Sequence, residues 1–186
     1  GREAPQTKEE TQEWLVGWQK GDKITRGPPN LWDVRKVIDM SDLFDHEELR
    51  EFNDPIGDWD MRNVVNMQRM FGGAESFNQP IGQWKTENVT NMSDMFCGAS
   101  TFNQPIGQWQ TENVTNMKKM FQSATSFNQP IGQWQTENVT TMESMFCYAT
   151  SFNQLIGQWK TENVTNMQSI FYGAKAMEEK NKPNIK

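Results

Sequence analysis

The chain has 186 residues, a net charge of −6 and a sequence pI of about 4.9. This acidic balance argues against a nucleic-acid-binding protein and against a polybasic membrane-surface protein, because both need clustered lysine and arginine. No apolar run approaches the roughly 20 residues that span a bilayer, so we expect no transmembrane segment. Twelve Met, eleven Phe and eight Trp accompany two Tyr, two Cys and one His, a bias that indicates copied short patterns.

The N-terminal region, residues 1–31, is expected to form a cap and a linker. Residues 7–10 read Thr-Lys-Glu-Glu, a capping-box pattern, and an apolar stripe that includes two tryptophans follows them. We therefore predict an amphipathic helix over 8–19 that covers the open end of the structure behind it. The proline- and glycine-containing stretch 21–30 is predicted to be the linker.

A 25-residue repeat fills the middle of the chain. Phe77, Ile81, Trp84, Met92 and Phe96 are landmarks that return at the same step without insertions. The repeat region, 32–176, divides into a half unit and five full units, 32–51, 52–76, 77–101, 102–126, 127–151 and 152–176. Residues 177–186 are then a polar C-terminal tail.

Each unit is expected to contain one short strand and one short helix. The stretch 80–84 suits a strand, and apolar residues spaced by three and four predict a helix over 89–97. One unit has too few large apolar side chains to be stable alone, so neighbouring units must share their burial. The predicted fold class is an α/β repeat solenoid, a right-handed stack of about 5.5 coils of parallel strands and helices with an N-terminal capping helix.

The pattern Phe-Asn-x-x-Ile-x-x-Trp, followed by Asn-Val-Thr-Asn-Met-x-x-Met-Phe, resembles a bacterial surface-protein repeat of about 25–26 residues. That repeat is grouped with BspA-like leucine-rich repeats and occurs in mycoplasma- and listeria-type lipoproteins. The resemblance covers 32–176 and implies a leucine-rich-repeat-like solenoid that acts in adhesion or protein binding, without enzymatic activity. Similar arrays occur in microbial eukaryotes, so the resemblance does not define a bacterial origin.

Residues at equivalent positions of the units should stack in columns. Trp, Phe and Met columns are predicted to be structural and buried in the core: Trp59, Trp84, Trp109, Trp134, Trp159, Phe77, Phe102, Phe127, Phe152, Met92, Met117, Met142 and Met167. Exposed tryptophans could instead stack on sugars, and the row of Thr86, Thr111, Thr136 and Thr161 could instead form an ice-binding face. The apolar spacing favours burial of the tryptophans, and no flat pair of Thr rows is evident.

The positions that differ between units are the candidate partner-facing ones. They are 68–69, 72–73 and their equivalents, which helical periodicity places on an outer face. The residues that we select there are Arg69, Asp94, Lys118, Lys119, Glu143, Tyr148 and Tyr172. A partner that contacts this side would meet different chemistry in each coil, whereas neutral drift on an exposed surface is the alternative.

Catalytic, metal and cofactor sites are not predicted. His46 is the single histidine and stands in an acidic bridge, and no Cys/His spacing suits zinc. The column of Glu87, Glu112, Glu137 and Glu162 could bind a cation or a basic partner, but nearby lysines, helix N-termini or solvent are the favoured explanation. Cys97 and Cys147 lie two coils apart, too far for a disulfide, so we expect free thiols.

The preferred function is a non-enzymatic module for protein–protein interaction or adhesion, with a protein partner and no nucleic acid. The alternative is a structural accessory or linker subunit of a multi-subunit assembly. The resemblance implies a location at the cell surface or outside the cytoplasm. The N-terminus does not have the layout of a signal peptide, so an exported protein would be the mature form. Free thiols leave an organelle lumen or another intracellular compartment open.

Overall fold

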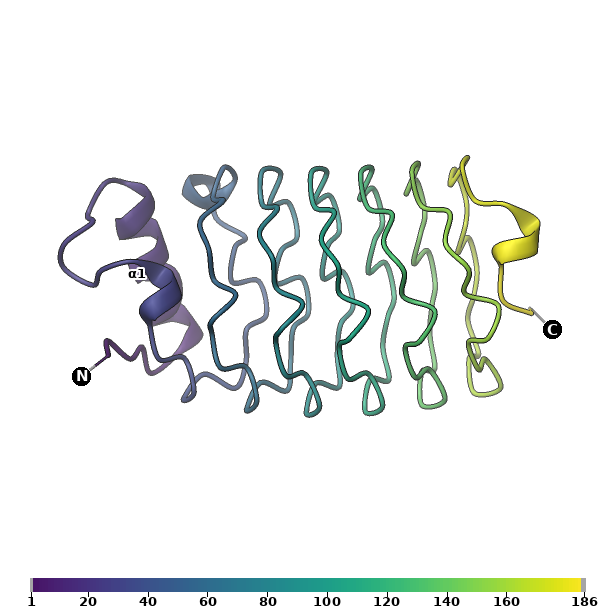
Figure 1. Ribbon diagram of the computed structural model, residues 1–186, viewed down its shortest axis with the longest axis horizontal. Coiled ribbons are helices and arrows are strands. Elements are labelled where there is room, and N and C mark those ends of the chain that lie inside the picture. The colour runs from purple at the N-terminus through teal and green to yellow at the C-terminus, as the bar shows by residue number, and fades with distance from the viewer. Residues whose placement is uncertain (1, 185–186) are drawn as a thin grey trace.

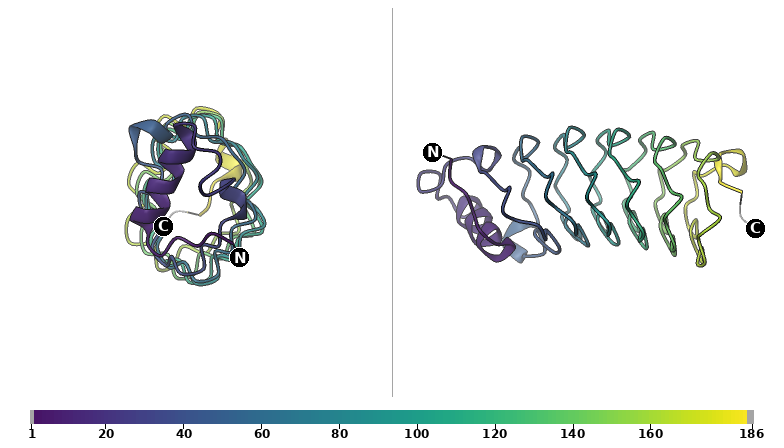
Figure 2. Two further views of the ribbon diagram at one scale, coloured as in Figure 1. Left: turned by 90° about the vertical axis from the view of Figure 1, so that its left-hand side faces the viewer. Right: turned by 90° about the horizontal axis from the view of Figure 1, so that it is seen from below.

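The computed structural model describes residues 2–184 as one helix followed by a stack of coils (Figure 1). The helix α1 (Lys8–Gln19) lies across the N-terminal end, and it covers the same residues as the predicted capping helix. Short 3-10 turns, η1 (Pro29–Leu31), η2 (Glu47–Leu49) and η3 (Glu179–Asn181), lie outside the five 25-residue units. Viewed along the axis, the coils superimpose as an oval ring (Figure 2).

The predicted α/β solenoid, with its leucine-rich-repeat-like strands and helices, is wrong. Within residues 2–184 the repeat units contain no α-helix, and their only β-type pairing is a series of isolated parallel bridges of one residue per coil. These bridges join Asp39, Asn66, Asn91, Asn116, Thr141 and Asn166 in succession. The segment 80–84, predicted to be a strand, contains no bridge, and 89–97, predicted to be a helix, is one bridge followed by turns.

A left-handed residue in the middle of the predicted helix explains why the helix does not form. Asp94 has a φ of +57°, which a right-handed helix does not allow. The Met95 amide donates to the Met92 carbonyl at 3.3 Å, a three-residue turn. The Asp94 amide donates instead to the Lys118 carbonyl in the next coil at 2.8 Å. Since each amide has one hydrogen, bonding between coils replaces the i to i−4 pattern of a helix.

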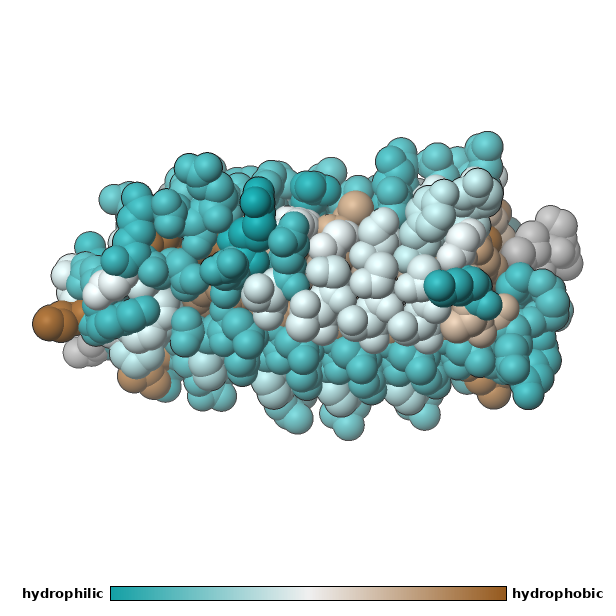
Figure 3. Space-filling view, turned by 90° about the horizontal axis from the view of Figure 1, so that it is seen from above, coloured by the Kyte–Doolittle hydropathy of each residue, from teal (hydrophilic) through white to brown (hydrophobic). Residues whose placement is uncertain are grey.

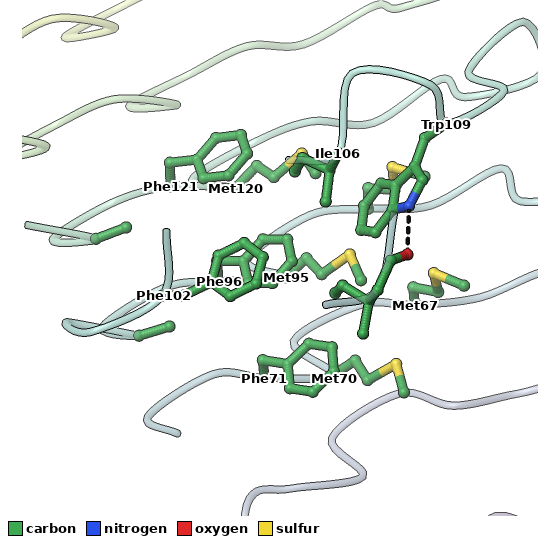
Figure 4. Close-up of a cluster of buried hydrophobic side chains, with 14 of the residues drawn as sticks. Met67, Met70, Phe71, Met95, Phe96, Phe102, Ile106, Trp109, Met120 and Phe121 are labelled. Carbon is green, nitrogen blue, oxygen red and sulfur yellow. Dashed lines mark hydrogen bonds between the residues drawn. The ribbon is translucent and has the colours of Figure 1, made fainter. Parts of the chain in front are cut away.

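Stacked aromatic rings form the core of the molecule. Phe71, Phe96 and Phe121 lie one above another, with centroids 5.5 Å apart and planes within 6° of parallel (Figure 4). Trp84 and Trp109 stack at 6.2 Å, and the next pairs of tryptophans at 6.3 Å. The interior rings are almost completely buried. Each ring therefore packs on its own equivalents in the coils above and below, and the Phe96 ring also packs closely on Phe102, at 4.3 Å.

The N-terminal cap is tied to the first coil by α1. The Thr7 hydroxyl accepts a hydrogen bond from the Glu10 amide at 3.1 Å, which begins the helix as the capping box predicts. Leu15 is fully buried, and the Gln12 amide group donates to the Leu43 carbonyl at 2.9 Å. α1 thus takes the place of a preceding coil and donates a hydrogen bond to a carbonyl of the first coil.

The described part of the C-terminal tail, 177–184, begins a further coil without completing it. Met177 is buried at the position of the repeat phenylalanines, and the Ile156 amide donates to the Asn181 carbonyl at 3.0 Å. Residues 185–186 of the predicted tail, and residue 1 of the predicted cap, lie outside the described residues. The tail therefore covers one side of the last coil.

Candidate functional site

The side chains that differ between coils form a strip along the stack, which we call the variable strip. It consists of 68–69 and 72–73 and their equivalents, 93–94, 97–98, 118–119, 122–123, 143–144, 147–148, 168–169 and 172–173. We predicted these residues on the outer face of a helix, but they lie in turns. The second residue of each first pair, from Arg69 to Ser169, has a φ between +53° and +59°. The turn geometry therefore repeats while its side chains change.

Charged side chains of alternating sign occupy the N-terminal part of the strip. Arg69 lies 4.0 Å from Asp45, and Lys118 lies 3.3 Å from Glu143. Asp94 is half-buried between these pairs, and burial raises the pKa of its carboxyl group against the opposing charge of Lys119. All seven candidate residues of the strip keep some exposure to solvent.

Two tyrosines dominate the C-terminal part of the strip. Tyr148 and Tyr172 are 47% and 62% exposed, and their rings meet edge to face at 5.4 Å. The Tyr148 ring lies over Gly173, where a Cβ atom would overlap it. Figure 3 shows a pale, weakly polar area on this face that runs from the middle of the stack toward its C-terminal end, bordered by more hydrophilic surface. The Ser and Thr residues of the adjoining turns, 100–101, 125–126 and 150–151, are of this weakly polar kind.

Cys97 and Cys147 are free thiols. They occupy the same repeat position as Gln122, one in the preceding coil and one in the following coil. Burial raises the pKa of both thiols, so the reactive thiolate is disfavoured at neutral pH. Gln122 Oε1 is the one buried side-chain oxygen or nitrogen in the described residues without a hydrogen-bond partner. These features are those of packed side chains and not of an activated nucleophile.

The structural columns lie inside the stack. Each repeat tryptophan donates its indole N–H to a carbonyl in the preceding coil, as Trp109 does to Ile81 at 3.0 Å (Figure 4). Trp59, Trp84, Trp109, Trp134 and Trp159 are at most 4% exposed, which leaves no ring face for a sugar. The other columns, Phe77, Phe102, Phe127, Phe152, Met92, Met117 and Met142, are fully buried, and Met167 in the last coil is partly exposed.

In the first Thr row, Thr86, Thr111 and Thr136 are buried, and Thr161 in the last coil is partly exposed. The Thr86 hydroxyl donates to the Gln110 carbonyl at 2.9 Å. A different row, Thr90, Thr115, Thr140 and Thr165, faces solvent. This second row was not predicted from the sequence. A turn at 87–88 separates the two rows.

The remaining candidates are His46 and the column of glutamates. His46 begins η2, where its Nδ1 atom accepts a hydrogen bond from the Glu48 amide at 3.0 Å. Glu87, Glu112 and Glu137 are partly exposed and Glu162 is exposed. Among residues 2–184 no group of three His, Cys, Asp or Glu side chains could hold a metal ion.

Leu155 is a surface feature that the sequence analysis did not select. It replaces the proline of the other units, is 59% exposed and borders a depression of about 340 Å³. The rest of the wall is mainly glutamine, from Gln108, Gln133, Gln154 and Gln158. The replacement of proline by leucine at this repeat position was the sequence signal that could have identified Leu155.

A stack of near-identical coils around a continuous aromatic core defines a tandem-repeat protein. The chain belongs to the family described as "Mycoplasma protein of unknown function, DUF285", which matches residues 18–117 and again residues 80–184. This confirms the resemblance to mycoplasma-type repeats, whereas the match does not support the leucine-rich-repeat grouping. Searches of the curated proteins and of the solved structures find no significant match. Within the described residues no helix is long and apolar enough to cross a bilayer.

Proposed function

We propose that this repeat protein is a non-enzymatic module that binds a protein partner through the variable strip. One observation carries the proposal. The backbone and core repeat from coil to coil, but the side chains of the strip change from arginine to aspartate, lysine and tyrosine. A partner lying along the stack would therefore meet a different, fixed set of groups at every coil.

The strip is preorganised, which favours binding because little conformational freedom is lost. The Tyr148 amide donates to the Tyr172 carbonyl at 2.7 Å, and the Tyr148 ring is held over Gly173. The binding loops of antibodies are likewise rich in tyrosine, serine and glycine. In those loops the rigid tyrosine rings supply contact area, and the small polar residues form adaptable hydrogen bonds. We infer that the two tyrosines anchor the partner.

The charged part of the strip would select the partner rather than supply most of the affinity. Pairs such as Lys118 and Glu143 lie at the surface, where the free energy of one ion pair is only about 0–1 kcal/mol. Alternating charges nevertheless disfavour a partner with the wrong pattern, since like charges then face one another. Adhesion is the use of such a strip that the resemblance to surface-protein repeats implies.

The absence of enzymatic activity is part of the proposal. Its support is the role of His46, whose imidazole is engaged as the cap of η2, and the raised pKa of both thiols. Loss of an activity on replacement of His46 would contradict this part of the proposal.

The test compares two double variants in affinity capture from a native extract. Tyr148→Ala/Tyr172→Ala removes the anchors, and Gln133→Ala/Gln158→Ala removes exposed side chains away from the strip. We expect the wild-type and glutamine variants to retain the same partner, and the tyrosine variant to retain at least about tenfold less, equivalent to 1.4 kcal/mol. Thermal melting establishes that both variants are folded.

Equal recovery with both variants would contradict the proposal. If the chain instead migrates on size exclusion with a large assembly that neither variant disrupts, the alternative of a structural accessory subunit would replace it.

A further inference from the structure

The charges of the variable strip are complementary to the same charges read in the opposite direction. From unit 52–76 to unit 127–151 the charge alternates in sign. The residues, in order, are Arg69, then Asp94, then Lys118 with Lys119, and then Glu143. Reversal of this order places Arg69 opposite Glu143, and Asp94 opposite the two lysines. A second copy of the chain, antiparallel to the first, would therefore present an opposite charge at each of these four units.

The sizes of the side chains are complementary in the same register. Unit 127–151 carries the exposed Tyr148, and the unit that would face it, 52–76, has Gly73 at the equivalent position. A Cβ atom added to Gly73 would meet open space. Gly98, at the equivalent position of the next coil, also lacks a side chain and lies close to Gly73. The two glycines therefore leave room for the Tyr148 ring of a second copy.

The shape of the strip allows this pairing over several coils. The coils superimpose when they are viewed along the axis, so the strip runs nearly straight along the stack (Figure 2). The residues from Arg69 to Ser169 that occupy the left-handed position of each turn share a φ between +53° and +59°. Equivalent side chains therefore leave the backbone in equivalent directions. Two such strips can lie side by side without losing register.

The charges at the centre of the strip lack an ion-pair partner in their own chain. Within residues 2–184, neither Asp94 nor Lys119 takes part in an ion pair. Both side chains are partly exposed, so a second chain can reach them. The Asp94 carboxylate is half-buried, where a charge is costly unless it is paired. An opposite charge from another copy would offset this cost.

We propose that the variable strip binds the variable strip of a second copy of this chain, in an antiparallel dimer with two-fold symmetry. The proposal rests on the proposed function and deepens it, since it identifies the protein partner as the chain itself. The two-fold axis passes between units 77–101 and 102–126, so each contact occurs twice. A two-fold axis along the stack would instead place Asp94 opposite Asp94, and facing like charges disfavour association. The charges therefore select the antiparallel arrangement.

Sedimentation equilibrium of the full chain, from about 1 µM to about 1 mM, measures the dissociation constant of the dimer. Asp94→Lys places like charges opposite each other, and it should weaken the dimer at least about tenfold. The double variant Asp94→Lys/Lys119→Asp brings opposite charges together again, and it should restore the dissociation constant to within about threefold. Glu112→Lys is the control. It makes the same change in net charge outside the strip, and it should alter the dissociation constant less than about twofold.

Thermal melting establishes that each variant is folded. If Asp94→Lys does not fold, Arg69→Glu tests the same register, because it would face Glu143 of the second copy and should weaken the dimer at least about tenfold. The proposal fails if the wild-type chain remains monomeric over this range, or if the double variant associates no better than Asp94→Lys. It also fails if Glu112→Lys weakens the dimer as much as Asp94→Lys does. A monomeric wild-type chain would leave the proposed function intact, because affinity capture with the tyrosine variant tests the binding of a different protein.

Discussion

At the scale of single residues, stability depends on columns of identical side chains. Phe96 stacks on Phe71 and Phe121 from the neighbouring coils and on Phe102 of the following unit at 4.3 Å. A cavity at one position is therefore lined by rigid rings that cannot collapse into it. The cost of truncation should depend on how many neighbours a ring has, which changes only at the ends of the stack.

We predict that Phe96→Ala lowers the free energy of unfolding by about 3–5 kcal/mol, because it leaves a cavity in a fully buried site. Phe171→Ala, at the same repeat position in the last coil, should cost less than half as much, since that ring is partly exposed. Urea denaturation of both variants measures the difference. Equal losses would contradict the stacked-ring description of the core.

Glycine in the Ile-Gly-Gln-Trp segment is required by the closeness of the next coil. A Cβ atom on Gly107 would lie 2.6 Å from the Pro130 carbonyl oxygen, a backbone atom that cannot move freely. On Gly157, at the same repeat position, the nearest atom would be 3.7 Å away, an ordinary contact. The same substitution should therefore be destabilising at Gly107 and tolerated at Gly157.

We predict that Gly107→Ala destabilises the protein by about 1–3 kcal/mol, the usual cost of overpacking, and that Gly157→Ala is neutral within about 0.5 kcal/mol. Thermal melting of the two variants is sufficient. A harmless Gly107→Ala would mean that the coils are farther apart than described.

At the scale of the element, turns form in place of a helix because alternate amides donate their hydrogen bonds to the next coil and not to the preceding turn of their own segment. Residues spaced by three and four lie on one side both in a helix and in two successive turns, so the apolar pattern is the same for both. The left-handed residues distinguish the two. Asp94, Lys119 and Ser123 have positive φ, a conformation that costs residues with a side chain roughly 1–2 kcal/mol.

We predict that Ser123→Gly raises the free energy of unfolding by about 0.5–1 kcal/mol. Its equivalents Gly73, Gly98 and Gly173 already use glycine at this left-handed position, with φ between +72° and +74°. Ser126→Gly is the control, because Ser126 does not have a positive φ, and this change should lower stability by about 0.5–1 kcal/mol. Chemical denaturation measures both. Destabilisation by Ser123→Gly would contradict the turn conformation.

At the scale of the whole molecule, the coils form a one-dimensional array between two different ends. Each interior coil has a neighbour on both sides, whereas α1 covers the first coil and the tail covers only part of the last one. In such arrays stability is approximately the sum of terms for each repeat and each interface. The ends impose a fixed cost, and additional interior coils contribute further stability.

Insertion of a second copy of residues 102–126 after Ser126 should therefore raise the melting temperature, by about 3 °C for each kcal/mol that the new interface contributes. An inserted copy in which the equivalents of Trp109 and Phe121 are alanine keeps the length but removes the stacked rings, and it should lower the melting temperature. A rise with both insertions would mean that coil length rather than stacking stabilises the array.

Part of the candidate site could be predicted from the sequence. The variation at Arg69, Asp94, Lys119 and Tyr148 is visible in the aligned repeats, and these residues do form one strip. The contact of the Tyr148 ring with Gly173 and the bonds between coils were not predictable. They depend on contacts between residues about 24 or 25 positions apart, whose geometry the sequence does not display.

The sequence by itself determined the period, the columns and the inner position of the aromatic side chains, because exact repetition forces equivalent residues into equivalent environments. It also determined α1, whose capping and apolar spacing are local. Only the tertiary structure decided the conformation within each coil, and so the absence of the predicted strands and helices. The reason is that a residue such as Asp94 donates its amide to Lys118 in the next coil, and this long-range bond overrides the local preference for a helix.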